Sequence, residues 1–212
     1  MTQHDVAGVQ QAVLDAAEAL ILESGFAATS IDAIAARAGV TKGALFHHFP
    51  SKAELARQLM TRYARRDADH LQQFLARAAV LSRDPLQQIL IVFGLYEDMA
   101  AALTGPHPGC LFASIWYEAR LHDDTTLQIV RDFFAWWRAT VAAKFQATMA
   151  IYRPRLPVTA EELADMALAI AEGSFILSRV HGDGRLVAQQ TREYRNYIEL
   201  LFSPPSPSVA VA

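Results

Sequence analysis

The sequence predicts an all-α fold, and three observations support this class. Apolar residues recur at the three-to-four-residue spacing of an amphipathic helix along most of the 212 residues. Between these stretches stand residues that begin or end helices, namely Ser, Thr and Asp as caps and Gly and Pro as breakers. No segment shows a convincing alternation of apolar and polar residues, which would indicate a strand. We therefore expect about nine helices.

Local capping patterns set the helix boundaries. Ser30 and Thr41 can each cap a short helix, and Pro50 ends the second of these. Two capping boxes, in which a Ser or Thr precedes a Glu by three residues, begin at Ser51 and Thr159. The expected helices cover residues of about 6–24, 31–38, 42–49, 52–80, 85–104, 110–121, 124–152, 160–180 and 185–202.

Composition limits the class of protein. The chain is 52% hydrophobic and 19% charged, which is enough apolar material for a packed core. A single cysteine cannot form an internal disulfide, and no secretory signal pattern opens the chain, so we expect a cytoplasmic protein. Charges interrupt every apolar stretch before it reaches the length of a membrane span, so no membrane partner is expected.

Charge is distributed unevenly, although the net charge is only −3. Residues 30–66 contain seven basic and two acidic side chains, whereas the chain from residue 67 onward contains 12 basic and 16 acidic ones. Such an asymmetry is expected when one part of a protein meets a polyanion. A basic, solvated surface without a partner is an equally good interpretation of charge alone.

Residues 29–52, TSIDAIAARAGVTKGALFHHFPSK, have the pattern of a helix-turn-helix. Two short helices flank a turn that contains Gly39, and Ile34, Val40 and Leu45 are spaced to pack them together. Gly43 in the first turn of the second helix costs about 1 kcal/mol relative to alanine, which suggests that a partner approaches closely there. The side chains left exposed are those of Thr41, Lys42, Gly43, Phe46, His47 and Lys52.

This segment resembles the DNA-binding region of the TetR family of bacterial transcriptional regulators. The family pattern is A-x-x-A-G-V, then T-K-G-x-L-Y-x-H-F, then a lysine that begins the next helix. The matching residues are Ala35, Ala38, Gly39, Val40, Thr41, Lys42, Gly43, Leu45, His48, Phe49 and Lys52. The match covers residues of about 10 to 55; beyond residue 60 only the helical layout is similar.

The resemblance implies a role for each matching position. A homodimer would bind a palindromic double-stranded operator, with the second short helix in the major groove. Phe46 departs from the family's tyrosine, which removes a phosphate hydrogen bond worth about 0.5–1.5 kcal/mol. His47 and His48 point about 100° apart on a helix and make a poor metal pair. The candidate DNA-binding residues are Ser30, Thr41, Lys42, Gly43, Phe46, His47, His48 and Lys52.

For the rest of the chain the resemblance implies an effector site. The sequence supports this with a high density of aromatic residues, including FFAWW at residues 133–137, although such a stripe is also typical of an ordinary core. His107 and Glu118 are further polar candidates. The candidate ligand-binding residues are Phe93, Tyr96, Cys110, Phe112, Trp116, Tyr117, Phe134, Trp137 and Arg138.

The last two expected helices are candidates for the dimer contact. The segment LADMALAIAEGSFIL at residues 163–177 is rich in small residues that let helices approach closely, and the final helix carries a second apolar stripe. Two copies would form a four-helix interface. Both helices could instead only cover the chain's own core. The candidate interface residues are Ala167, Ala171, Ser174, Phe175, Tyr194, Tyr197, Ile198 and Leu201.

These observations lead to one function hypothesis and two alternatives. The leading hypothesis is a dimeric repressor that a small apolar or aromatic molecule releases from its operator. Cys110 at a helix start could instead sense oxidants or electrophiles, or the chain could be a helical interaction module that binds no DNA. No catalytic motif is present, so we expect no enzyme, cofactor or metal. The expected domains are 1–55 for DNA binding, 56–203 for effector binding and dimerisation, and a disordered tail at 204–212.

Overall fold

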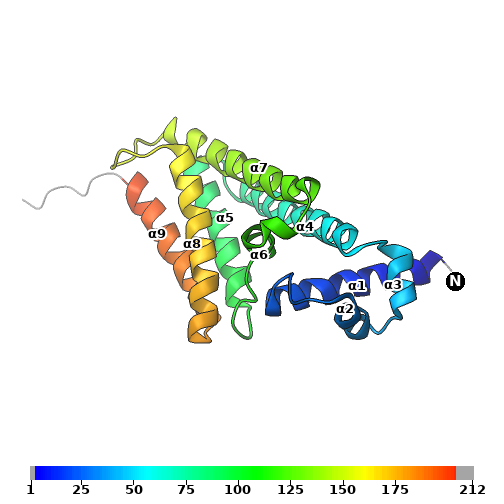
Figure 1. The fold of residues 1–212 in the computed structure, drawn as a ribbon. Helices are drawn as coiled ribbons and strands as arrows, with labels where there is room; N and C mark the ends of the chain where they lie inside the picture. Colours follow the sequence, from blue (N-terminus) through cyan, green and yellow to red (C-terminus); the bar gives the residue numbers. More distant parts are fainter. Residues whose placement is uncertain (1–2, 204–212) are drawn as a thin grey trace, which may run out of the picture. The chain divides into compact units, whose positions relative to one another are not determined.

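The computed structural model describes residues 3–203, and in this range it contains helices and no strand (Figure 1). The all-α prediction is therefore confirmed. The tail expected at 204–212 lies outside the described residues. The helices are α1 (Gln3–Ser24), α2 (Ile31–Ala38), α3 (Lys42–His48), α4 (Lys52–Leu81), α5 (Pro85–Ala101), α6 (Leu111–Tyr117), a 3₁₀ turn η1 (Ala119–Leu121), α7 (Asp124–Met149), α8 (Ala160–His181) and α9 (Arg185–Phe202).

Side-chain caps fix most of the helix starts where they were expected. The Ser30 hydroxyl accepts a hydrogen bond from Ala33 N at 3.1 Å, and Thr159 forms a complete capping box at the start of α8. The box predicted at Ser51 is only half formed, because the Glu54 carboxylate pairs with Arg57 instead of reaching back to the cap. The helix ends differ more from the expected positions than the starts do. Helix α5 stops at Ala101 rather than near residue 104, and α7 stops at Met149 rather than near residue 152.

The described chain divides into two compact units. The first comprises the residues up to His70 together with Pro108–Trp136, and the second comprises Leu71–His107 and the residues from Trp137 onward. The expected boundary at residue 55 falls inside α4, which continues without a break to Leu81. The sequence could not show that residues 108–136 belong to the first unit. These residues join it because α6 packs against α1, which is far away in the sequence.

In the first unit, α1 packs against α2, α3 and α6. Its core is built from fully buried side chains that α1 to α4 contribute from their apolar faces. Burial of this kind stabilises the fold by about 1.5–3 kcal/mol per large side chain. The fully buried members include Ala17, Ile21, Ile34, Leu45, Phe49, Leu55 and Leu59.

In the second unit, α5, α8 and α9 lie side by side (Figure 1). Tyr194 on α9 joins two of them, because its hydroxyl donates to Leu163 O at 2.6 Å and its ring packs against Phe93. The Tyr152 hydroxyl donates to the carboxylate of Asp84, which also caps α5. In the described range, no helix is both long enough and apolar enough to cross a bilayer.

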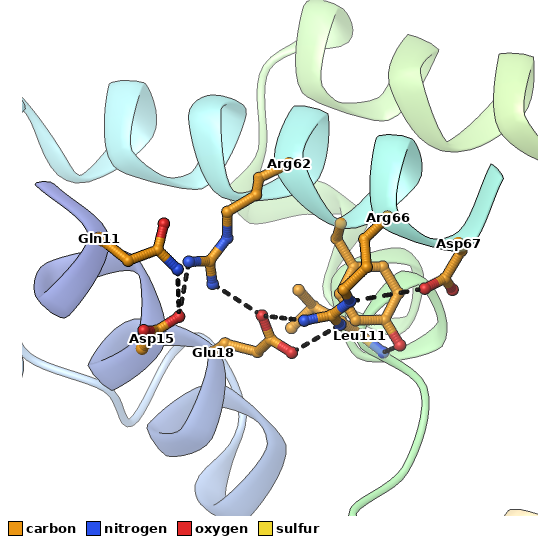
Figure 2. Close-up of polar contacts among 8 residues, drawn as sticks. Gln11, Asp15, Glu18, Arg62, Arg66, Asp67 and Leu111 are labelled. Atoms are coloured by element: carbon orange, nitrogen blue, oxygen red, sulfur yellow. Dashed lines mark hydrogen bonds and ion pairs between the residues drawn. The ribbon is translucent and has the colours of Figure 1, made fainter. Parts of the chain in front are cut away.

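An ion-pair network joins α1 to α4 (Figure 2). The Glu18 carboxylate accepts hydrogen bonds from Arg62 at 2.9 Å and from Arg66 at 2.8 Å, and Arg62 also pairs with Asp15 at 2.6 Å. Burial raises the pKa of the neighbouring Asp67 to about 6, while the Arg66 guanidinium acts in the opposite direction. Since Glu18 is shared between two arginines, it is the centre of the network.

Replacing Glu18 should therefore destabilise the protein more than replacing Asp15. Glu18→Ala leaves two arginines without their shared acceptor, and we expect a loss of about 1.5–3 kcal/mol. Asp15→Ala removes a more exposed partner and should cost less than about 1 kcal/mol. Urea unfolding at one fixed protein concentration measures both changes. Equal losses in the two variants would contradict the central role of Glu18.

Candidate nucleic-acid interface

Helices α2 and α3 form a helix-turn-helix whose turn depends on Gly39. This residue has φ +68°, in the left-handed region that favours glycine, and its N–H donates to Ala36 O at 3.2 Å. Val40 N then donates to Ala35 O at 3.0 Å, which closes the end of α2. The Thr41 hydroxyl accepts from Ala44 N at 3.1 Å and starts α3 two residues after the turn.

Two buried anchors decide which side of α3 faces solvent. Leu45 on the helix and Phe49 at its C-cap are both fully buried, so the opposite side of the helix is held outward. His48 is half-buried, with its ring centroid 6.4 Å from that of Phe49. The side chains on the exposed side are those of Thr41, Lys42, Phe46 and His47. Gly43 lies among them, and a Cβ at this position would lie 3.9 Å from Thr41 Oγ1, an ordinary van der Waals contact.

The positive charge of this region is lower than the distribution along the sequence suggested. Lys42 pairs with Asp32 at 2.8 Å, and Arg37 pairs with Glu23 at 2.9 Å. The charge count over residues 30–66 does not include the acidic residues of α1. Several of these pair with basic residues of α2 and α4. Charge alone therefore supports nucleic-acid binding less strongly than the geometry of α3.

Ser30 and Lys52, two of the candidate DNA-binding residues, each make a hydrogen bond within the protein. The exposed Ser30 hydroxyl already caps α2. Lys52 is half-buried, and its Nζ donates to Phe26 O at 2.6 Å in the turn between α1 and α2. Burial lowers the pKa of the Lys52 ammonium, while the nearby Glu118 carboxylate acts to raise it. The Lys52 ammonium is thus directed toward the protein, whereas the family resemblance implied a phosphate contact.

The candidate ligand-binding residues fall into both units. In the first unit, the Phe112 ring stacks on Phe133 with centroids 4.4 Å apart and meets Phe134 at 5.5 Å. Trp116 and Tyr117 do not join this cluster by burial, since they are 45% and 83% exposed. Among the candidate ligand-binding residues of this unit, Phe112 and Phe134 are therefore the two that form an aromatic cluster.

Four ligand candidates, Phe93, Tyr96, Trp137 and Arg138, belong to the second unit. Phe93 is buried against Phe145 and Tyr194, and Tyr96 meets Phe74 edge to face at 4.8 Å. Trp137 is buried. Arg138 is exposed, and its guanidinium forms two hydrogen bonds with Asp165 on α8. Phe93 and Trp137 thus have the burial of ordinary core residues.

Two polar candidates are also explained by packing. Cys110 is the N-cap residue of α6 and is only 8% exposed, which shields its thiol from soluble oxidants and weakens the sensor hypothesis. The His107 ring stacks on Phe175 with centroids 3.7 Å apart, and burial lowers its pKa to about 4, so the ring is neutral at neutral pH. In the described part of the chain, no group of His, Cys, Asp or Glu side chains could hold a metal ion.

Most residues expected at the dimer contact face the chain's own core. Phe175 stacks on His107, and Ala171 and Tyr197 are half-buried. The apolar side chains that α8 does expose are different ones, of which Ile176 is 58% and Val180 73% exposed. On α8 the small residues Ala164, Ala167 and Ser174 are buried, and α9 packs against this helix. The buried members of the expected set are Ala167, Ser174, Tyr194, Ile198 and Leu201.

One hollow that the sequence did not suggest lies in the second unit. The loop after α7 and the end of α9 line a cleft of about 880 Å³, which contains Tyr152, Arg153, Arg155 and Phe202. The loop is fastened to α9 by Arg155 N, which donates to Leu201 O at 2.9 Å. None of the predicted ligand-binding residues lines this cleft.

A helix-turn-helix that presents one polar side of its second helix defines a class of DNA-binding proteins. The family model of the bacterial regulatory proteins of the tetR family matches residues 13–59. A second model, the C-terminal domain of LmrA/YxaF-like transcriptional regulators, matches residues 82–192, more than half of the chain. The chain belongs to the TetR family of transcriptional regulators, whose members are not enzymes.

Similar proteins agree with this assignment. A TetR-family regulator from Agrobacterium tumefaciens is 26% identical, with a TM-score of 0.76 over 93% of this chain and all of its own. A TetR regulator from Chloroflexus aurantiacus is 25% identical, with a TM-score of 0.71 over 92% of this chain and 96% of its own. The transposon Tn10 TetC protein of Escherichia coli is 42% identical over 53 residues, about a quarter of either chain.

Lys42 should contribute to DNA binding through its charge. Its ion pair with Asp32 joins two exposed side chains and is worth only about 0–1 kcal/mol, so the ammonium can exchange this partner for a phosphate. Lys42→Ala should weaken binding and reduce the slope of log affinity against log salt by about one per half-site. Arg153→Ala, an exposed charge outside the first unit, is the control. An unchanged slope for Lys42→Ala would place Lys42 outside the contact.

Proposed function

We propose that this protein is a dimeric repressor that binds a palindromic operator and leaves it when a small apolar or aromatic molecule binds. The observation that carries the proposal is the exposed side of α3, where Thr41, Lys42, Phe46 and His47 lie around Gly43, which has no side chain. This side is held outward by the burial of Leu45 and Phe49, and the major groove of B-DNA admits an α-helix.

Within this proposal the exposed residues have different tasks. Thr41 and His47 carry hydrogen-bonding groups that suit base edges or phosphates, and Lys42 supplies charge. Phe46 is 39% exposed and offers an apolar surface for a sugar or a thymine methyl group. The missing side chain at Gly43 lets the backbone approach the nucleic acid, which accounts for a glycine in the first turn of a helix.

Family membership implies DNA binding and dimerisation, and the chain offers a surface for the second copy. We place it on α8 and α9, where Ala169, Gly173, Ile176 and Val180 form an exposed or half-exposed stripe with the spacing of a coiled-coil seam. Leu200 on α9 is also exposed and apolar. A closed twofold contact on this stripe would match a twofold-symmetric operator.

The aromatic residues support an apolar effector. The half-buried Phe134 beside Phe112 in the first unit, and the half-buried Tyr96 beside Phe74 in the second, offer ring faces and edges to a ligand. The guanidinium of the exposed Arg138, the charged residue among the ligand candidates, is bound to Asp165. A ligand releases DNA only through different affinities for the two states of the protein.

Footprinting on the DNA beside its own gene tests the proposed function. We expect protection of a palindrome whose half-sites lie about 10 base pairs or a multiple apart, because each α3 enters one major groove. Binding should weaken steeply with salt. Adding apolar aromatic compounds should reduce the protection. A chain that gives no salt-sensitive protection on any such DNA would instead support the interaction-module alternative.

Charged substitutions in the apolar stripe of α8 test the proposed dimer surface. Ile176→Asp together with Val180→Asp should convert a dimer into a monomer, because carboxylates in an apolar seam would be desolvated without partners. Val80→Asp is the matched control, since Val80 is 86% exposed on α4. Light scattering during gel filtration measures the mass. A dimer that survives the double change while remaining folded would move the interface elsewhere.

A further inference from the structure

The turn between α1 and α2 depends on side chains from distant parts of the first unit. Phe26 N and Ala27 N donate to the two carboxylate oxygens of Glu118, at 2.9 and 2.8 Å. Phe26 O accepts from Lys52 Nζ at 2.6 Å and from Thr29 N at 3.2 Å. One peptide segment is therefore held on its donor side by the C-cap residue of α6 and on its acceptor side by the first residue of α4.

The fit between Glu118 and the turn requires a glycine. Gly25 has φ +85°, and a Cβ at this position would lie 2.6 Å from Glu118 Oε1. Alanine here would thus be strained in its backbone and would also collide with the carboxylate. Gly25, which follows α1, therefore adopts the left-handed backbone conformation and also leaves room for the Glu118 carboxylate at the end of α6.

The ring of Phe26 completes the contact. It is 5% exposed, its centroid lies 4.0 Å from Lys52 Nζ, and the His122 ring lies 4.2 Å away. The ammonium of Lys52 therefore meets both the carbonyl and the aromatic face of the same residue, a geometry that favours a cation. Phe26 is fixed from the backbone and from the side chain together.

We propose that Glu118 is a positioning residue for DNA binding, and that Lys52 acts with it by holding the Phe26 peptide rather than by contacting phosphate. The turn leads within four residues to Ser30, which caps α2, and α2 packs against α3. The hydrogen bonds from the turn to Glu118 therefore fix the direction of α2, and with it the orientation of the exposed side of α3. This inference rests on the proposed function.

The position of Glu118 at the end of α6 gives the contact a second consequence. A shift of α6 that withdraws the carboxylate leaves the N–H groups of Phe26 and Ala27 without their charged acceptor, so the turn loosens while the buried anchors of α3 stay in place. Lys52 then loses the negative charge beside it as well. Glu118 thereby links the end of α6 to the turn that precedes α2.

The test uses the full chain and the DNA duplex defined by footprinting. Glu118→Ala should reduce operator affinity by about tenfold or more, because two hydrogen bonds to a charged acceptor are lost. The exposed Asp69→Ala on α4 removes the same charge and should stay within about twofold. Active protein is counted by stoichiometric titration, so a misfolded fraction lowers the count and leaves the dissociation constant unchanged. Amide hydrogen exchange at Phe26 and Ala27 should accelerate in Glu118→Ala only.

Two further variants keep the proposal open to refutation. Glu118→Gln offers one carbonyl acceptor in place of two and should fall between the parent and Glu118→Ala. Lys52→Ala should weaken binding without changing the salt slope, and its effect should combine with that of Glu118→Ala less than multiplicatively, because both side chains hold one peptide.

Three results would overturn it: an affinity of Glu118→Ala within twofold of the parent, unchanged exchange at Phe26 and Ala27, or a salt slope that falls by about one per half-site in Lys52→Ala, which marks a phosphate contact. Absence of DNA binding by the parent protein would overturn the proposed function instead, and the exchange measurement would still decide whether Glu118 holds the turn.

Discussion

The burial of Leu45 and Phe49 is the constraint on which the DNA-facing surface depends. Both side chains are fully buried, so α3 cannot rotate without exposing a large apolar side chain to water, at a cost of about 1.5–3 kcal/mol each. α3 spans only Lys42–His48, too short to be stable alone, and its orientation comes from this packing rather than from helix propensity. Caps at Ser30 and Thr41 then determine where the two short helices begin. The polar side chains of α3 can face solvent because Leu45 and Phe49 fix the opposite side of the helix in the core.

Charge has a more local role than its distribution along the sequence suggests. Arg62 and Arg66 bind Glu18, and Arg37 binds Glu23, so these basic residues connect α1 to α2 and α4. The same charges that appear as a basic segment in the sequence therefore stabilise the first unit. Lys42 differs because both partners in its ion pair are more than half exposed, which keeps the ammonium available. The structure thus separates cations that hold the fold from one that can be exchanged for a phosphate.

The sequence predicted what depends on near neighbours. The starts of α2, α3, α5 and α8 follow from caps within three residues, and the helix-turn-helix follows from the Gly39 turn and the spacing of Ile34 and Leu45. Contacts across the sequence could not be predicted in this way. Glu118 lies 92 residues from Phe26, and no local pattern indicates that its carboxylate accepts from that turn. Lys52 matched a family position, yet its direction is decided by Phe26 and Glu118.

Helices with apolar residues on two sides illustrate the same limit at the level of assembly. On α8 the sequence shows both Ala167 and Ser174 on one side and Ile176 and Val180 on another, and periodicity does not tell which side meets the chain's own core. The tertiary structure decides it, because the side of α8 with Ala167 and Ser174 is buried and the side with Ile176 and Val180 is left in solvent. Exposed β-branched side chains in a seam spacing are costly for a monomer and suitable for a twofold contact. An interface is therefore better sought among apolar residues that the fold fails to bury than among those whose composition looks interfacial.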